Sequence, residues 1–250
     1  MSIKLINVCR YYQGLPHQNE ALEYLQSRID PNVLATFAQG FRSPPSEPPD
    51  NTHLGRITKR LRELAITLVK PTKGYNAYVI AFEGYNTDLK ANGDKPDAWN
   101  DAVCVLAIDA NGKLEISDIF QCTTEPGRHY IENRLNPKGA AFALTDVLHK
   151  DIWIKGTHKD QPNCLIQSGN TIEVRRDQNG DGIRGTAEPL DAGWFGINFH
   201  HTKGNYDPKS IGRWSAGCCV LPNPQQHRYL VDIASKAQNK KISYVILSEV

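Results

Sequence analysis

A proline-rich segment divides this chain into two parts with different hydrophobic patterns. Residues 43–50 read Ser-Pro-Pro-Ser-Glu-Pro-Pro-Asp. Prolines at this density cannot continue a helix or a central strand, and they favour a stiff, extended connector. The segment is therefore the best predicted domain boundary, with one part over residues 1–45 and a linker that begins at residue 46.

Helical spacing dominates before this boundary and just after it. Apolar residues over positions 20–41 recur mostly at three- and four-residue steps, which predicts two short helices, the second starting at Pro31. A further helix is predicted over residues 52–69. We therefore expect a small helical N-terminal segment over residues 1–45, then a Pro-rich linker and connecting helix over residues 46–74.

From residue 75 onward the pattern changes to short β-type runs separated by turns. A closing helix is predicted over residues 224–237 and a last strand over residues 242–247. We expect a mostly β (α+β) domain over residues 75–250. Its other predicted strands cover residues 77–82, 102–108, 114–120, 152–154, 171–174 and 194–199.

Composition excludes several classes of protein. The 250 residues are 40% hydrophobic and 22% charged, which is enough to bury a substantial core. Lys and Arg (29) nearly balance Asp and Glu (27), so no basic surface for nucleic acid is expected. The N-terminal apolar stretch, Ile3 to Cys9, is too short and polar for a signal peptide or a membrane span. The six cysteines show no CxxC spacing, so reduced thiols are expected.

A histidine and a cysteine near the C-terminus fit nucleophilic catalysis, whereas a small buried thiol and a hydrogen-bonding histidine are the other interpretation of the same pair. Cys218 follows Gly217, and His200 lies eighteen residues upstream at the end of the apolar run 195–199. A thiol attacks a carbonyl carbon only as thiolate, so it needs a nearby base. A strand and a loop of this length can bring imidazole and thiol together, and the amides of Gly217 and Cys218 are candidates for an oxyanion hole.

Two neighbours compete for these roles. His201 titrates in the same range as His200, but adjacent residues of a strand face opposite sides, so only one can face the thiol. We prefer His200 as the base. For the same reason we expect Cys219 to point away from Cys218 and to pack in the core.

The loop before the cysteine supplies candidate substrate-binding residues. Arg213 and Trp214 approach the nucleophile along the chain, and His201 lies close to the predicted base. Charge and ring stacking suit contact with a peptide substrate. A solvated arginine and a half-buried tryptophan fit these two positions of the loop equally well.

The segment resembles the active-site motif of the L,D-transpeptidase catalytic domain family. That motif is a histidine, a loop and then Gly-x-x-Ser-His-Gly-Cys, and His200, Gly212, Ser215, Gly217 and Cys218 match it in order. The spacing between histidine and cysteine is also that of the family. A second, weaker likeness lies upstream, over residues 124–127.

Residues 124–127, Thr-Glu-Pro-Gly, are similar to a Thr-Pro-x-Gly turn of the same domains, with Glu125 inserted, and a β-like stretch is expected over residues 129–131. The chain departs from the family at two points. Ala216 stands where the family carries a second histidine, and residues 220–221, Val-Leu, replace an Arg or Asn. The first departure removes a hydrogen-bonding group, and the second leaves open which group holds a substrate carboxylate.

The resemblance implies a β-sandwich catalytic domain over residues 75–250 that acts on peptidoglycan stem peptides. Cys218 and His200 would be its nucleophile and base, with Gly217 and Ser215 in the same catalytic motif. Acyl transfer through a thioester would end in transpeptidation, or in L,D-carboxypeptidase or endopeptidase hydrolysis, and it needs no cofactor. The alternative is a non-catalytic cell-wall-binding or calcium-stabilised module with a degenerate transpeptidase fold.

A second motif fits the spacing of a calcium loop. Oxygen donors recur at loop positions 1, 3, 5 and 12, and a backbone carbonyl is expected at position 7. The flanks read as strand rather than helix, so a paired helix-loop-helix is not expected. An Asx- and Gly-rich hairpin turn is the other interpretation. The candidate ligands of a structural Ca²⁺ are Asp177, Asn179, Asp181, Ile183 and Glu188.

Peptidoglycan lies outside the cytoplasm, whereas no signal peptide is recognised at the N-terminus. We therefore expect a protein made in the cytoplasm that acts in the periplasm or cell wall after lysis or leaderless export. A phage-like or secretion particle would be a suitable partner. The helical segment over residues 1–45 would then serve for targeting or wall binding.

Overall fold

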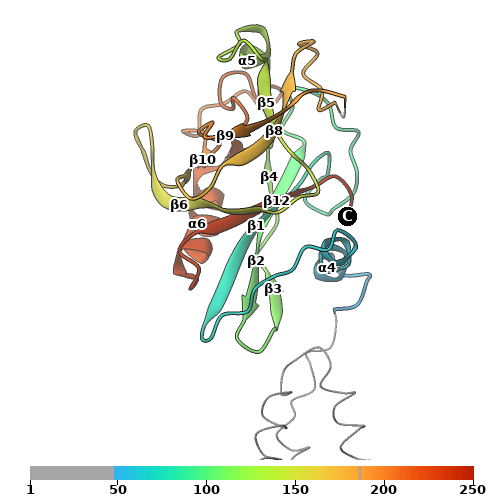
Figure 1. Cartoon of the computed structure of the whole chain (residues 1–250), viewed down its shortest axis with the longest axis vertical. Coiled ribbons are helices and arrows are strands. Elements are labelled where there is room, and N and C mark those ends of the chain that lie inside the picture. The colour runs from blue at the N-terminus through green and yellow to red at the C-terminus, as the bar shows by residue number, and fades with distance from the viewer. Residues whose placement is uncertain (1–47, 186) are drawn as a thin grey trace, which may run out of the picture. The chain divides into compact units, whose positions relative to one another are not determined.

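The first described helix belongs to the same unit as the strands that follow it. This computed structural model describes residues 48–185 and 187–250, and the predicted helices over residues 1–45 lie outside them (Figure 1). Residues 48–250 form one unit, which includes helix α4 (His53–Glu63). The side chain of Thr52 accepts a hydrogen bond from Gly55 N and caps the start of α4.

The predicted connecting helix is shorter than expected. It was expected to reach residue 69, but α4 ends before Leu64. Ala65 has a φ of +55°, and Ile66 N donates to Leu61 O, so a left-handed residue closes the last turn. The apolar residues beyond the helix still pack against its core cluster, which explains why their spacing extended the prediction.

Two sheets account for the strands of the described residues. The strands of the larger sheet are β1 (Tyr75–Phe82), β2 (Asp101–Asp109), β3 (Leu114–Ile116), β4 (Phe120–Cys122), β6 (His149–His158), β7 (Gln161–Gln167), β10 (Phe199–His201), β11 (Cys219–Leu221) and β12 (Ile242–Leu247). Their order is β11–β10–β7–β6–β12–β1–β2–β3, with β4 also paired to β2. The smaller sheet has the order β5–β8–β9, formed by β5 (Ala140–Ala143), β8 (Ile172–Asp177) and β9 (Leu190–Gly193).

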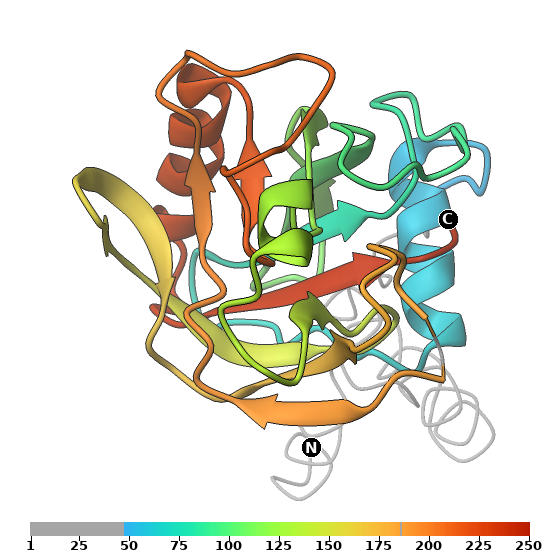
Figure 2. The ribbon, with the colours of Figure 1, turned by 90° about the horizontal axis from the view of Figure 1, so that it is seen from above.

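Alternation along β1 separates two cores. Val79 and Ala81 join a cluster with the smaller sheet and helix α6 (Pro224–Lys236), whereas Ile80 and Phe82 join a cluster with α4. The two helices therefore cover opposite faces of the larger sheet (Figure 2). The fold is mostly β with a few helices, as the sequence predicted.

The larger sheet nearly closes on itself. β10 and β11 are parallel neighbours at one edge, while β4 pairs with β2 near the other. Just beyond β4, Thr123 N donates to Val220 O at 2.9 Å, and Val220 N donates to Thr123 O at 2.9 Å. The two edges therefore meet at the segment that carries Cys218.

The predicted β-like stretch over residues 129–131 is wrong. These residues lie in helix α5 (Arg128–Glu132), which begins after Gly127. None of the α5 side chains is buried. The alternation of residue types that predicted a strand therefore does not reflect packing against a core. Gly127 N instead donates to Ser215 O at 2.9 Å, which turns the chain toward the nucleophile loop.

The strand predicted over residues 194–199 is shorter than expected, since only Phe199 of that run lies in β10. The side chain of Gln167 accepts hydrogen bonds from three consecutive amides, those of Phe195, Gly196 and Ile197. These amides are therefore satisfied without a partner strand. In the part of the chain that the structure describes, no helix is long and apolar enough to span a membrane.

Candidate active site

The turn before Cys218 is held by its own side chains. Ser215 is 0% exposed; its Oγ donates to Cys218 O at 2.8 Å and accepts from Gly217 N at 3.1 Å. Gly217 has a φ of +121°, and a Cβ at this position would lie 2.4 Å from Ala141 O. Ser215 and Gly217 therefore shape the turn that presents Cys218.

One of the two amides expected in an oxyanion hole is already occupied. Gly217 N–H points to the Ser215 hydroxyl, so it does not face a substrate. Cys218 N–H has no hydrogen-bond partner among the described residues. Cys218 N–H is therefore the amide left to bind a developing oxyanion, and the expected pair of donors is reduced to one.

The Cys218 thiol is almost enclosed. Cys218 is 8% exposed; its Sγ accepts from Asn198 N at 3.3 Å and donates to Gly196 O at 3.5 Å. Burial raises the pKa of this thiol to about 11, although the hydrogen bond from the Asn198 amide opposes the shift. At neutral pH the group is therefore a thiol, and it needs a base to become a nucleophile.

His200 and Cys218 share one face of the sheet. The parallel pair β10–β11 places Phe199 beside Cys219 and His200 beside Val220. Cys218 lies two residues before Val220, and alternate residues of a strand face the same side. His200 is thus a diagonal neighbour of Cys218, while Cys219 faces the opposite side and packs in the main core, as predicted.

The imidazole of His200 is oriented as a neutral base. Its Nδ1 lies 3.2 Å from His201 O, and a carbonyl only accepts, so Nδ1 carries the proton and Nε2 is left as an acceptor. Burial lowers the pKa of His200 to about 3, and charge on nearby His158 acts in the same direction. At rest the candidate base and nucleophile are therefore both uncharged.

A second imidazole and an asparagine complete the site, and sequence reasoning missed both. The ring of His158 stacks on that of His200, with centroids 4.3 Å apart and planes 16° apart. Asn198 Oδ1 accepts from Gln167 N at 2.7 Å, so its Nδ2 donates to His158 Nδ1 at 2.8 Å. Asn198 therefore connects Cys218 to His158. His158 lies in a distant hairpin, and no local motif marks it.

His201 lies away from the thiol. It belongs to the opposite face of β10 and lines a cavity of about 400 Å³ together with Lys203, His227 and Arg228. The rings of His201 and His227 lie 4.9 Å apart, and His201 Nδ1 contacts Thr202 O. The structure therefore does not bring His201 into the group formed by Cys218 and His200.

Of the two candidate substrate-binding residues in the loop, Arg213 and Trp214, only Trp214 packs against the buried cluster that contains Cys218. Arg213 is exposed, whereas Trp214 is half-buried against a cluster that contains Cys218, Ile211 and Trp99. Arg213 can therefore reach a substrate in solution, and Trp214 lies beside the nucleophile.

Asp97 fixes the loop that carries these residues. Its carboxylate accepts from Ser210 Oγ at 2.7 Å, from Gly212 N at 2.9 Å and from Arg128 N at 2.8 Å. Trp99 Nε1 donates to Asp207 O at 2.9 Å in the same loop. The contacts of Asp97 and Trp99 with residues 207–212 span more than a hundred residues of sequence, so no local pattern predicts them.

The calcium-like loop forms a hairpin connection between β8 and β9, as its turn interpretation predicted. Asp177 accepts from Gly180 N at 2.6 Å and from Gly182 N at 3.1 Å. Oxygens of Asp177, Asp181 and Glu188 lie within 4.8 Å of one another. Glu188 Oε1 is buried and has no partner among the described residues.

The other two predicted ligands of this loop have different environments. Asn179 accepts from Asp181 N at 3.2 Å and donates to the Asp181 carboxylate at 2.7 Å. The side chain of Ile183 is exposed, and its amide donates to Asp181 Oδ1 at 2.8 Å. Hydrogen bonds within the loop therefore stabilise the turn by themselves.

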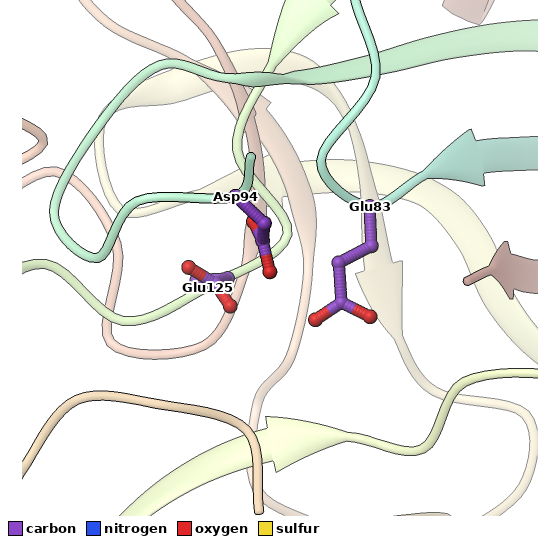
Figure 3. A group of neighbouring side chains, drawn as sticks. All are labelled: Glu83, Asp94 and Glu125. Carbon is purple, nitrogen blue, oxygen red and sulfur yellow. The ribbon is translucent and has the colours of Figure 1, made fainter. Parts of the chain in front are cut away.

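A second acidic cluster lies near the nucleophile turn, and no sequence motif indicated it. Oxygens of Glu83, Asp94 and Glu125 lie within 4.8 Å of one another (Figure 3). Burial raises the pKa of Glu125, and the charge of Asp101 raises it further. Burial likewise raises the pKa of Asp101, against a hydrogen bond from Gly84 N–H.

Comparison with known proteins adds no relative: no family model, no curated protein and no solved structure matches this chain.

Proposed function

We propose that this protein is a cysteine acyltransferase of the L,D-transpeptidase type that acts on peptidoglycan stem peptides, on an L,D-transpeptidase-like β-sandwich. The observation that supports the proposal is the pairing of His200 with Val220, which packs in one buried cluster with Cys218, while His200 Nε2 is left as an acceptor. The resemblance of the His200–Cys218 segment to that family supplies the substrate class.

The first half-reaction moves one proton and one acyl group. His200 Nε2 takes the proton of Cys218 Sγ, and the thiolate attacks the carbonyl between an L-centre and a D-amino acid. The amine of the D-residue leaves with the proton returned by the imidazolium. A thioester on Cys218 remains, and an amine from another stem or a water molecule then accepts the acyl group.

Substrate binding must open the resting site. Cys218 Sγ is enclosed by the Gly196 carbonyl and the Asn198 amide, and an incoming carbonyl has to displace the first of these contacts. Cys218 N–H is the available oxyanion donor, worth on the order of 3 kcal/mol. Burial and the neighbouring His158 both lower the pKa of His200, so the imidazolium forms only transiently during the step.

The place of action follows from the substrate. We propose action in the periplasm or cell wall, with a phage-like or secretion particle as a partner. Arg213 is an exposed cation five residues before Cys218 and is our candidate to bind a stem-peptide carboxylate.

A non-catalytic cell-wall module is the second candidate, and the resting charges favour it. The thiol with a pKa of about 11 and the imidazole with a pKa of about 3 do not form an ion pair at neutral pH. In this reading the loop from Asp177 to Glu188 binds a structural Ca²⁺, supported by the buried, unpaired Glu188 Oε1.

Replacement of Cys218 separates these functions. Incubation with disaccharide tetrapeptides and mass spectrometry of the products distinguishes crosslinked, trimmed and untouched peptides. We expect Cys218→Ala to lower turnover by at least about 1000-fold. We expect Cys219→Ala, the matched change at the next residue, to retain turnover because that thiol faces the core.

The intact protein provides the decisive readout. A mass increase equal to the acyl group, absent in Cys218→Ala, supports the thioester. Tetrapeptide binding without any acylation of wild-type protein favours the non-catalytic module, and unchanged turnover in Cys218→Ala contradicts the proposed mechanism.

A further inference from the structure

The acidic cluster brings three connections of the fold together. Glu83 follows β1, Asp94 lies in the connection from β1 to β2, and Glu125 lies between β4 and α5. Their side chains are directed toward a common space (Figure 3). Oxygen atoms from all three lie within 4.8 Å of one another, a separation at which carboxylates repel strongly unless a cation or a proton lies among them.

Arg184 compensates only part of this charge. It forms an ion pair with Glu83 Oε1, and its guanidinium also donates to Ala143 O and Thr124 Oγ1. Asp101, close by, already accepts from Gly84 N at 2.9 Å and from Thr124 N at 2.6 Å. The single guanidinium of Arg184 therefore lies near four carboxyl groups, those of Glu83, Asp94, Asp101 and Glu125.

The carboxylate of Glu125 is compensated only by the nearby charge of Arg184. Glu125 is 3% exposed, and its carboxylate has no hydrogen-bond donor among the described residues. A buried carboxylate without a donor costs several kcal/mol unless it binds a cation or a proton. A second acceptor next to the cluster, Asn100 Oδ1, is also buried without a partner in the described part of the chain.

We propose that Glu83, Asp94 and Glu125 bind one hard divalent cation of the Ca²⁺ or Mn²⁺ class. Carboxylate oxygens are the donors such ions prefer. Two oxygens that each lie about 2.4 Å from a central ion are at most about 4.8 Å apart, and the oxygens of the three groups lie within 4.8 Å of one another, as ligands of one ion would. Arg184 bonds to Oε1 of Glu83 and leaves Oε2 free to bind the ion.

The position of the site couples the ion to the nucleophile turn. Glu125 precedes Pro126, which forms a β-bridge with Ala216, two residues before Cys218. Asp94 is exposed on the other side, so water can complete the coordination and the ion can enter from solvent. The cation therefore fixes the segment on which the turn rests without contacting the thiol.

Titration of the full chain tests this site separately from acyl transfer. Protein freed of metal with EDTA and dialysed is titrated with MnCl₂ and with CaCl₂, and bound ion is followed by calorimetry and by the Mn²⁺ paramagnetic resonance signal. We expect Glu125→Gln, which removes the charge and keeps the shape, to weaken binding at this site by about tenfold or more. We expect Asp181→Asn, the matched change in the hairpin loop, to leave the Glu125-dependent binding unchanged.

The unfolding temperature, measured with and without metal, is a second test that does not depend on the affinity found by titration. In EDTA, Glu125→Gln should unfold at or above the wild-type temperature, because like-charge repulsion is relieved. With CaCl₂ or MnCl₂, only the wild type should gain stability at this site. Asp94→Asn, an exposed change, gives the same readout if Glu125→Gln does not fold.

Wild-type protein that binds neither ion overturns the proposal. So does binding that Glu125→Gln and Asp94→Asn leave unchanged, since the ion would then occupy the hairpin loop or another site. None of these outcomes depends on turnover of muropeptides.

Discussion

The nucleophile turn and the acidic cluster lie on either side of the segment from Thr123 to Gly127, and they are completed in different ways. In the turn, Ser215 satisfies the backbone of Gly217 and Cys218 with its own hydroxyl. In the cluster, Glu125 is equally buried but has no donor. Protein atoms therefore satisfy the polar groups of the turn except for Cys218 N–H, whereas in our proposal the cluster binds a cation.

The same contrast holds for charge. Burial drives His200 and Cys218 to their neutral forms, so no counter-ion is required at rest. In the cluster, Arg184 forms an ion pair with Glu83, whereas Asp94 and Glu125 have no ion pair among the described residues. A buried site can thus avoid the cost of desolvated charge by neutralisation or by binding an ion, and the two regions illustrate one solution each.

The largest expected effect tests how closely the nucleophile turn is packed. Gly217→Ala would place a Cβ 2.4 Å from the Ala141 carbonyl at a φ of +121°, and we expect a loss of about 4 kcal/mol in the free energy of unfolding. The matched control is Gly204→Ala, since Gly204 has a φ of +82° and no atom within 4 Å. Urea denaturation compares them, and equal losses would mean that the turn is no more constrained than an open loop.

The next prediction concerns how the free energy of unfolding depends on pH. Burial lowers the pKa of His227 from 6.5 to about 3, so between these values the unfolded chain binds more protons and stability falls as pH falls. His227 Nε2 lies at hydrogen-bond distance, 3.2 Å, from Phe199 O, and Phe199 immediately precedes His200. We expect His227→Gln to recover on the order of 3 kcal/mol of this acid loss at pH 4.

Urea unfolding at pH 7 and at pH 4 measures the acid loss. His53→Gln, an exposed change on α4, is the control and should leave the pH dependence unchanged. An acid loss of the same size in wild type and His227→Gln would show that other groups carry it.

The smallest expected effect tests the loop around the thiol. Asp97→Asn keeps a residue type that tolerates the φ of +58° but weakens the contacts to Ser210 and Gly212, at a cost of about 2 kcal/mol. We expect faster alkylation of Cys218 by iodoacetamide, because the loop opens more often. Asp207→Asn, an exposed residue of the same loop, should not change the rate, and an unchanged rate in Asp97→Asn would exclude Asp97 as the residue that holds the loop closed.

Strong local patterns predicted much of the fold. β1, β2, β12 and α6 follow from apolar runs whose period agrees with their burial. The run from Trp194 to Asn198 was misread as strand because its amides are satisfied by Gln167, a partner that no local pattern identifies. The helical turn at α5 was missed because its side chains are not buried, so hydrophobic spacing carries no information there.

The candidate site likewise has residues that the sequence predicted and residues that it did not. The resemblance of the segment to the L,D-transpeptidase motif selected His200 and Cys218 as candidates, and strand alternation predicted that Cys219 packs in the core, as it does. Asn198, His158 and the acidic cluster depend on pairing between segments far apart in sequence. Only the register of the sheet brings them together, and this register cannot be predicted from the local pattern of one sequence.

The pairing of β1 with β12 has a consequence for the kinetics of folding. These strands are parallel neighbours in the middle of the larger sheet, although more than 150 residues separate them in the chain. Sheets that depend on such distant contacts fold slowly, because the loop must close before any pairing is gained. During that delay Cys218 is an ordinary accessible thiol, so an oxidant present during refolding should damage it far more than the same oxidant added to the native protein.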